Sequence, residues 1–234
     1  GNGLTSTVMA GVEWAVAQGA QIINISLGGQ QYPSDATDAF SLLCDAAVEH
    51  GVVVCVAAGN LGPIARTIGS PAATESVITD TAAATTDRVA AFSSRGPTGT
   101  GSIKPDVVFP GVGIVSARAA GTVLGTPVGA RYTAVSGTSQ ATPMATGTSA
   151  LLLQANPRLT PAELKARLRR GARRLPNEEA TAQGTGRGDT YNTFVSAAGT
   201  PLGTAPSTSS PETSPEPDER AGCVPGTAAG LLGR

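Results

Sequence analysis

A serine at the start of an apolar helix is the feature of this sequence best suited to chemistry. Residues 137–143 read Gly-Thr-Ser-Gln-Ala-Thr-Pro, and an apolar stretch continues to residue 154. The glycine supplies a turn, so Ser139 falls where unpaired N–H groups and the positive end of a helix dipole favour developing negative charge. Pro143 is expected in the first turn, where a missing N–H costs no hydrogen bond. The pattern indicates a candidate catalytic hydroxyl.

A catalytic serine also needs a base, and the 234 residues contain a single histidine, His50. His50 ends a predicted helix just before a predicted strand over residues 52–58, and Asn60 follows the far end of that strand. At about 3.3 Å per residue, the strand separates His50 from Asn60 by roughly 20 Å. A general base works within about 2.6–3.2 Å of its partner. We therefore interpret His50 as an ordinary helix-end residue, favourable there when protonated.

No carboxylate stands out as the group that would orient a base. Asp87 precedes an arginine and Asp106 follows a proline, and these two aspartates, like Asp80, are expected in turns or at the surface. The cysteines lack metal-ligand spacing. Cys44 and Cys55 are expected to be small core residues.

The elements around these residues alternate between helix and strand. Apolar residues recur at helical spacing over residues 8–16 and 40–48, and almost continuous apolar runs follow at residues 22–27 and 52–58. This alternation is typical of a buried parallel sheet, so the predicted fold class is α/β, a three-layer, mostly parallel sheet flanked by helices. Further strands are expected at residues 77–79, 89–92 and 106–109.

Another strongly marked helix begins after Thr160. Thr160 and Glu163 form a capping box, and Pro161 takes the first helical position. Three leucines mark its buried side: Leu164, Leu168 and Leu175. The basic residues are expected on a solvated face: Lys165, Arg167, Arg169, Arg170, Arg173 and Arg174.

The composition argues against nucleic acid and membranes as partners. The net charge of −1 gives no global field for nucleic acid or anionic membranes, and no apolar run approaches the roughly 20 residues of a membrane-spanning helix. Residues 199–234 are rich in Pro, Ser and Thr, which predicts a flexible tail or linker after a domain over residues 1–198.

Three segments end on glycine or polar residues where ligands bind parallel sheets, at the carboxyl ends of strands. They are residues 26–29, 57–60 and 137–139. In this order the chain resembles the subtilisin-like serine peptidases, the subtilases, over roughly residues 5–198. The serine motif of that family, Gly-Thr-Ser-x-Ala-x-Pro, is matched at residues 137–143, and its asparagine block is matched by Ala-Ala-Gly-Asn at residues 57–60. Residues 92–97 and 104–111 look like the connecting region of the family.

The resemblance implies a serine endopeptidase that works through an acyl-enzyme. Ser139 would be the nucleophile, and Asn60 would donate its side-chain amide to the oxyanion alongside the Ser139 N–H. An extended polypeptide substrate would pair as an added strand with the backbone of Ser26, Leu27 and Gly28. The pocket for the side chain before the scissile bond would be walled by Leu27, Ala57, Ala58 and Gly59.

In the subtilases, an aspartate and a histidine precede these blocks. The resemblance therefore implies that the amino-terminal part of the domain is missing, that this segment is a needed partner, and that the chain alone is inactive. We also expect exposed apolar sheet edge and a tendency to aggregate. Many subtilases are secreted, which implies an extracellular location. Members often bind calcium, so the resemblance alone leaves calcium open as a cofactor. No acidic cluster with the necessary oxygen ligands is apparent, and the sequence identifies no metal site or other cofactor.

Two other interpretations are open. The chain could be a non-catalytic subtilase-fold module that holds extended peptides, and a histidine-containing block upstream would argue against that. An α/β-hydrolase esterase is the third, but its serine elbow requires Gly-x-Ser-x-Gly, and Ala141 occupies the last position.

Overall fold

Four parallel strands form the central sheet, and each pairs with the next along the chain. The computed structural model describes residues 3–29, 33–84 and 87–195. The strands are β1 (Ile22–Ile25), β2 (Val53–Ala57), β3 (Ile78–Ala83) and β4 (Val107–Pro110), in the order β1-β2-β3-β4. Because all are parallel, their carboxyl ends meet along one edge of the sheet.

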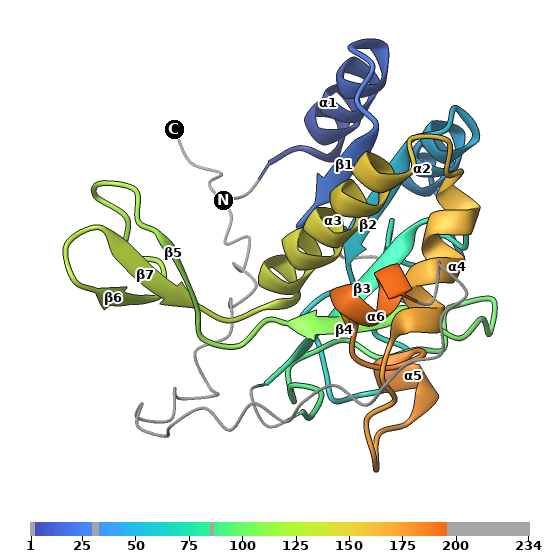
Figure 1. Ribbon diagram of the computed structural model, residues 1–234. Coiled ribbons are helices and arrows are strands. Elements are labelled where there is room, and N and C mark those ends of the chain that lie inside the picture. Colours follow the sequence, from blue (N-terminus) through green and yellow to red (C-terminus); the bar gives the residue numbers. More distant parts are fainter. Residues whose placement is uncertain (1–2, 30–32, 85–86, 196–234) are drawn as a thin grey trace, which may run out of the picture.

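Helices cover both faces of this sheet, as the sequence predicts. α1 (Thr5–Ala17) and α2 (Ala39–Glu49) pack on one face, and α3 (Thr138–Ala155) and α4 (Pro161–Gly171) pack on the other (Figure 1). Alternating strand side chains feed the two cores: Val54 and Val56 join the core under α1 and α2, and Cys55 and Ile78 join the core under α3. The structure is thus α/β with three layers.

The buried cysteines agree with the sequence prediction. Cys44 and Cys55 are both 0% exposed and free. Burial raises the pKa of the Cys44 thiol to about 12 and also raises that of Cys55. Both therefore remain thiols that act as small core residues.

The start of α4 also follows the sequence prediction. The Thr160 side chain accepts a hydrogen bond from the Glu163 N–H, and the Glu163 carboxylate accepts one from the Thr160 N–H at 2.9 Å. Leu164, Leu168 and Leu175 are all buried. Two shorter helices follow, α5 (Ala180–Gln183) and α6 (Thr190–Val195).

A second, smaller sheet lies apart from the first and was not predicted. It contains β5 (Ile114–Ala117), β6 (Thr126–Val128) and β7 (Tyr132–Val135), antiparallel in the order β5-β7-β6, and projects from the body of the molecule (Figure 1). The strand predicted at residues 89–92 is wrong. Val89 forms only an isolated bridge with Ala83, because the chain turns at once and the Ser93 N–H bonds back to the Ala90 carbonyl. The tail predicted over residues 199–234 lies outside the described residues.

Candidate active site

Ser139 lies at the start of α3, beside the carboxyl end of β1. Its Oγ donates a hydrogen bond of 2.9 Å to the carbonyl of Ser26. In return, the Ser26 Oγ donates to the Ser139 carbonyl, also at 2.9 Å. This reciprocal pair fixes the first turn of α3 against the residue that follows β1. The serine hydroxyl is thereby held at the edge of the sheet where the strands end.

Pro143 lies deeper in the helix than predicted. α3 begins at Thr138, so Pro143 is its sixth residue and falls in the second turn rather than the first. An ordinary residue there would donate its N–H to the carbonyl of Ser139, four residues earlier. Proline lacks that N–H, and the Ser26 hydroxyl takes its place as donor. The helical hydrogen bond that Pro143 cannot make is thus replaced by one from Ser26, which connects the end of β1 to Ser139.

Asn60 follows β2 and reaches the same helix start. Its Oδ1 accepts hydrogen bonds from the Thr138 N–H at 3.0 Å and the Thr138 hydroxyl at 3.1 Å. The Thr138 hydroxyl in turn accepts from the Gly59 N–H at 3.2 Å. Because Oδ1 is held by Thr138, Nδ2 is the end of the amide left to donate. That Nδ2 lies 3.5 Å from where a Cβ on Gly137 would stand, beside the serine turn.

Two positioning groups in this cluster were missed in the sequence. Thr138 orients Asn60, and the Ser26 side chain supports the Ser139 carbonyl. Both lie inside or beside motifs that the sequence identifies, but a motif gives no side-chain partner. The available signal for Ser26 was Pro143. A proline four residues after Ser139 leaves the Ser139 carbonyl without its helical donor, so another group must donate to it.

The residues predicted to bind substrate lie around this point. Ser26, Leu27 and Gly28 continue directly from β1, and Leu27 is 45% exposed. Gly28 runs close to another segment, since an added Cβ would lie 3.1 Å from the Ser70 carbonyl. Ala57 ends β2, and Ala57, Ala58 and Gly59 lead to Asn60, with the two alanines buried.

His50 lies at the other end of β2 from Asn60. It caps the carboxyl end of α2, and its Nδ1 lies 2.8 Å from the Ala46 carbonyl. The chain then enters β2 and travels its whole length before reaching Asn60. The one histidine of the chain is therefore at the wrong edge of the sheet to act on Ser139.

Two aspartates expected in turns or at the surface are instead buried. Asp80 lies in β3 and is 0% exposed, and Asp106 is 3% exposed just before β4. Asp106 binds two lysines, Lys104 at 2.8 Å and Lys165 at 3.1 Å. Burial alone would raise the pKa of Asp106, but the two lysines outweigh it and the pKa falls below 3.8. For Asp106 the prediction failed because one of the partners that permit burial, Lys165, is distant in the sequence, and the nearby Lys104 alone gives no sign of burial.

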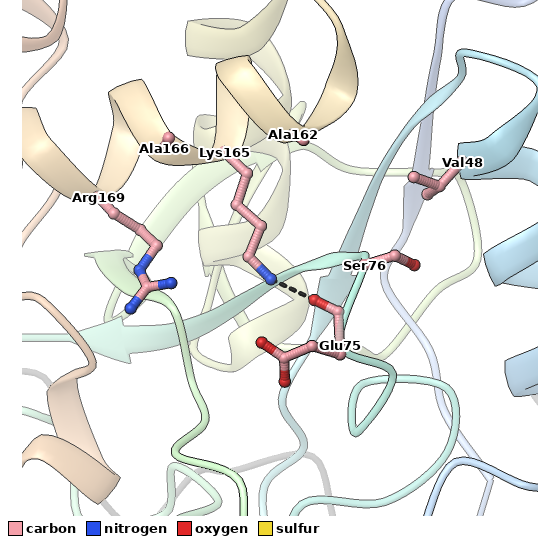
Figure 2. Close-up of a pocket in the computed structure, with 7 residues that line it drawn as sticks. All are labelled: Val48, Glu75, Ser76, Ala162, Lys165, Ala166 and Arg169. Atoms are coloured by element: carbon pink, nitrogen blue, oxygen red, sulfur yellow. Dashed lines mark hydrogen bonds between the residues drawn. The ribbon is translucent and has the colours of Figure 1, made fainter.

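Lys165 is correspondingly not on the solvated face. Its side chain turns inward from α4, and its ammonium donates to the carbonyl of Glu75 (Figure 2) and also to that of Val77. The stem passes a cavity of about 240 Å³ between α4 and the end of α2, lined in part by Val48, Ala162 and Arg169. This cavity lies away from Ser139.

Asp87, the third aspartate, occupies a turn as predicted. Its φ is +56°, and it pairs with the guanidinium groups of Arg173 and Arg187. Over the described ranges, no three His, Cys, Asp or Glu side chains gather as metal ligands would. None of the described helices is both long and apolar enough to cross a membrane.

The structure is an α/β protein in which a helix carrying a serine starts at the carboxyl edge of a parallel sheet. Comparisons with known proteins identify the family that shares this arrangement. Residues 1–188 match the subtilase family, peptidase family S8. This chain therefore belongs to the subtilase family, whose members are serine proteases. The resemblance stated from the sequence is confirmed.

Individual relatives support the same assignment. The serine protease AprX of Bacillus subtilis is 40% identical over 207 residues, which is 80% of this chain and 47% of that protein. Subtilisin amylosacchariticus, from Bacillus subtilis subsp. amylosacchariticus, is 38% identical over 179 residues, or 76% of this chain and 42% of that protein. The chain thus spans less than half the length of these two relatives.

Solved structures show the same fold. The prenylagaramide maturation protease PagA matches with a TM-score of 0.66 and 25% identity, over 80% of this chain and 65% of that one. A protease from Pseudoalteromonas arctica matches with a TM-score of 0.69 and 28% identity, over 84% of this chain and 60% of that one.

Proposed function

We propose that this chain carries the nucleophile and the oxyanion site of a serine endopeptidase that cleaves peptide bonds through an acyl-enzyme. The observation that carries the proposal is the convergence of Ser139 and Asn60 on one helix start, linked through Thr138. Ser139 is the nucleophile. Asn60 Nδ2 and the Ser139 N–H, which lies in a turn with no helical acceptor, stabilise the oxyanion.

The substrate is an extended polypeptide. Its backbone pairs with the segment Ser26, Leu27 and Gly28, which leaves the sheet at the point where the nucleophile stands. Small walls at Ala57, Ala58 and Gly59, with Leu27, suit a large apolar side chain before the scissile bond. As in many subtilases, the site of action is extracellular.

The base and its orienting aspartate come from polypeptide outside this sequence. The outer side of β1 supports this proposal, because it pairs with no other strand in the described part of the chain and is free to accept one. A cavity of about 220 Å³ follows that side, lined by α1 and β1 residues that include Val8, Val12 and Ile23. An added strand there would reach the serine edge of the sheet. Without it, the chain is inactive towards peptides.

A second candidate function is a peptide-binding module without catalysis. The position of His50, away from Ser139, favours it, because an unassisted serine hydroxyl is a poor nucleophile near neutral pH. Asn60 argues for the enzyme, since a pure binder has no need of a donor aimed at an oxyanion.

Chemical rescue of the missing base distinguishes the two functions. A p-nitrophenyl ester of a blocked peptide needs a base to activate the serine but no acid for the leaving group. We expect imidazole to produce ester hydrolysis by this chain beyond the rate of imidazole itself. Removing one oxyanion donor from a subtilisin lowers turnover by about 10²–10³-fold, and we expect the same order for Asn60→Ala.

The matched control is Ser139→Ala, which measures the imidazole background in the presence of protein. Hydrolysis at the same rate in wild type and Ser139→Ala, with normal folding of both by circular dichroism, would leave the binding module as the better function. A burst of p-nitrophenol equal to the protein concentration would support the acyl-enzyme.

A further inference from the structure

Asp80 is a carboxyl group placed in the middle of the sheet, beneath the helix that carries Ser139. It lies in β3 between Ala57 of β2 and Val107 of β4, and it is 0% exposed. Strand alternation puts its side chain on the face of Ile78 and Ala82. Those two residues share a core with Ala141 and Ala145 of α3. Asp80 therefore faces α3.

Neither carboxyl oxygen of Asp80 has a hydrogen-bond partner. Buried polar groups are nearly always paired, and burying an unpaired charge is far more costly than burying a neutral group. The covering helix supplies no cation to pair with this carboxylate, because α3 contains no ionisable side chain from Thr138 to Ala155. This carboxyl group thus lies in a setting that disfavours its ionised form.

The ionisable groups around Asp80 do not offset this effect. The thiol of Cys55 on β2 is neutral, and Asp106 beside β4 repels a second negative charge. The two nearby cations, Lys104 and Lys165 of α4, are already bonded to Asp106. Each attracts Asp80 only at a distance.

We propose that Asp80 is a pH-sensitive latch: as a neutral acid it lets α3 pack on the sheet, and its ionisation at higher pH loosens that packing. The proton passes to solvent when α3 lifts. Because Ser139 lies in the first turn of α3, the latch also controls the placing of the nucleophile. That last consequence rests on the proposed function, whereas the coupling of packing to pH does not.

The direction of the pH effect follows from linkage. Burial, reinforced by Asp106, raises the pKa of Asp80 well above 3.8 in the folded protein. The folded state then holds a proton that the unfolded state has released, so the contribution of Asp80 to stability is greatest below pH 3.8. It is lost as the pH rises from there towards the folded pKa, by up to tenfold in the unfolding constant per pH unit.

The test compares urea unfolding of the wild-type chain with Asp80→Asn, which keeps the shape but cannot ionise. Other titrations are common to both proteins and cancel in the ratio of their unfolding constants. We expect the unfolding constant of wild type, divided by that of Asp80→Asn, to rise by up to about 100-fold between pH 5 and pH 7. A ratio that stays constant over this range would overturn the latch.

Asp87→Asn is the matched control, because it removes a carboxylate that is 31% exposed and paired with two arginines. We expect Asp87→Asn to destabilise the protein slightly. The ratio of unfolding constants between wild type and Asp87→Asn should not rise with pH as it does for Asp80→Asn. Amide exchange of α3, corrected for its intrinsic pH dependence, gives the same comparison where unfolding is not cooperative. Equal protection of α3 in wild type and Asp80→Asn at every pH would also overturn the latch. Neither measurement depends on catalysis, so a failed imidazole rescue leaves this test intact.

Discussion

At the residue scale, the buried charges around Asp106 depend on one another. The Lys104 ammonium is 0% exposed and donates to Asp106 and to the Val77 carbonyl, and burial lowers its pKa to about 8. Removing one partner of a buried ion pair leaves an uncompensated charge. We therefore expect Asp106→Asn to lower the free energy of unfolding by about 3–5 kcal/mol, measured in urea at pH 7.

The same residue predicts an acid-side signature. Because the pKa of Asp106 is lowered on folding, its stabilisation is present above pH 3.8 and is lost as the pH falls through the folded pKa. Asp106→Asn should remove that loss. Asp87→Asn again serves as control, since its ion pairs are partly exposed to solvent and their loss should cost less than about 1 kcal/mol. Equal costs for the two substitutions would contradict a buried charge cluster.

At the element scale, the start of α3 is held by a bond from another element instead of its own ladder. We expect Ser26→Ala to cost about 1–2 kcal/mol, because it leaves the Ser139 carbonyl without its donor. In a Pro143→Ala background, the new N–H of residue 143 can bond that carbonyl, so the cost of Ser26→Ala should shrink. A double-mutant cycle in urea measures this coupling. Additive costs would show that Pro143 has no part in the arrangement.

The elements that the sequence predicts well are those whose signals are local. The apolar runs give β1 and β2, the capping box gives α4, and the serine motif gives the start of α3. The failures depend on contacts that no local pattern contains. Asp106 is buried because the distant Lys165 meets it together with the nearby Lys104, and Lys165 turns inward for the same reason. β5, β6 and β7 are short and largely exposed, so they lack the apolar signal of a core strand.

At the scale of the whole molecule, apolar surface is uncovered on α3, and the outer side of β1 is unpaired in the described part of the chain. Met144 and Leu151, seven residues apart on one face of α3, are 40% and 48% exposed, and an unpaired strand edge is a template for association. We expect the chain alone to self-associate as its concentration rises, measured by sedimentation velocity. Met144→Lys combined with Leu151→Lys should reduce this association, because charges on the exposed apolar face of α3 oppose contact with a second copy. Val123→Lys, at a position 95% exposed in the loop between β5 and β6, should not. A wild-type chain that stays monomeric and melts cooperatively would mean that this surface needs no covering segment, and would remove the support for a base supplied along β1.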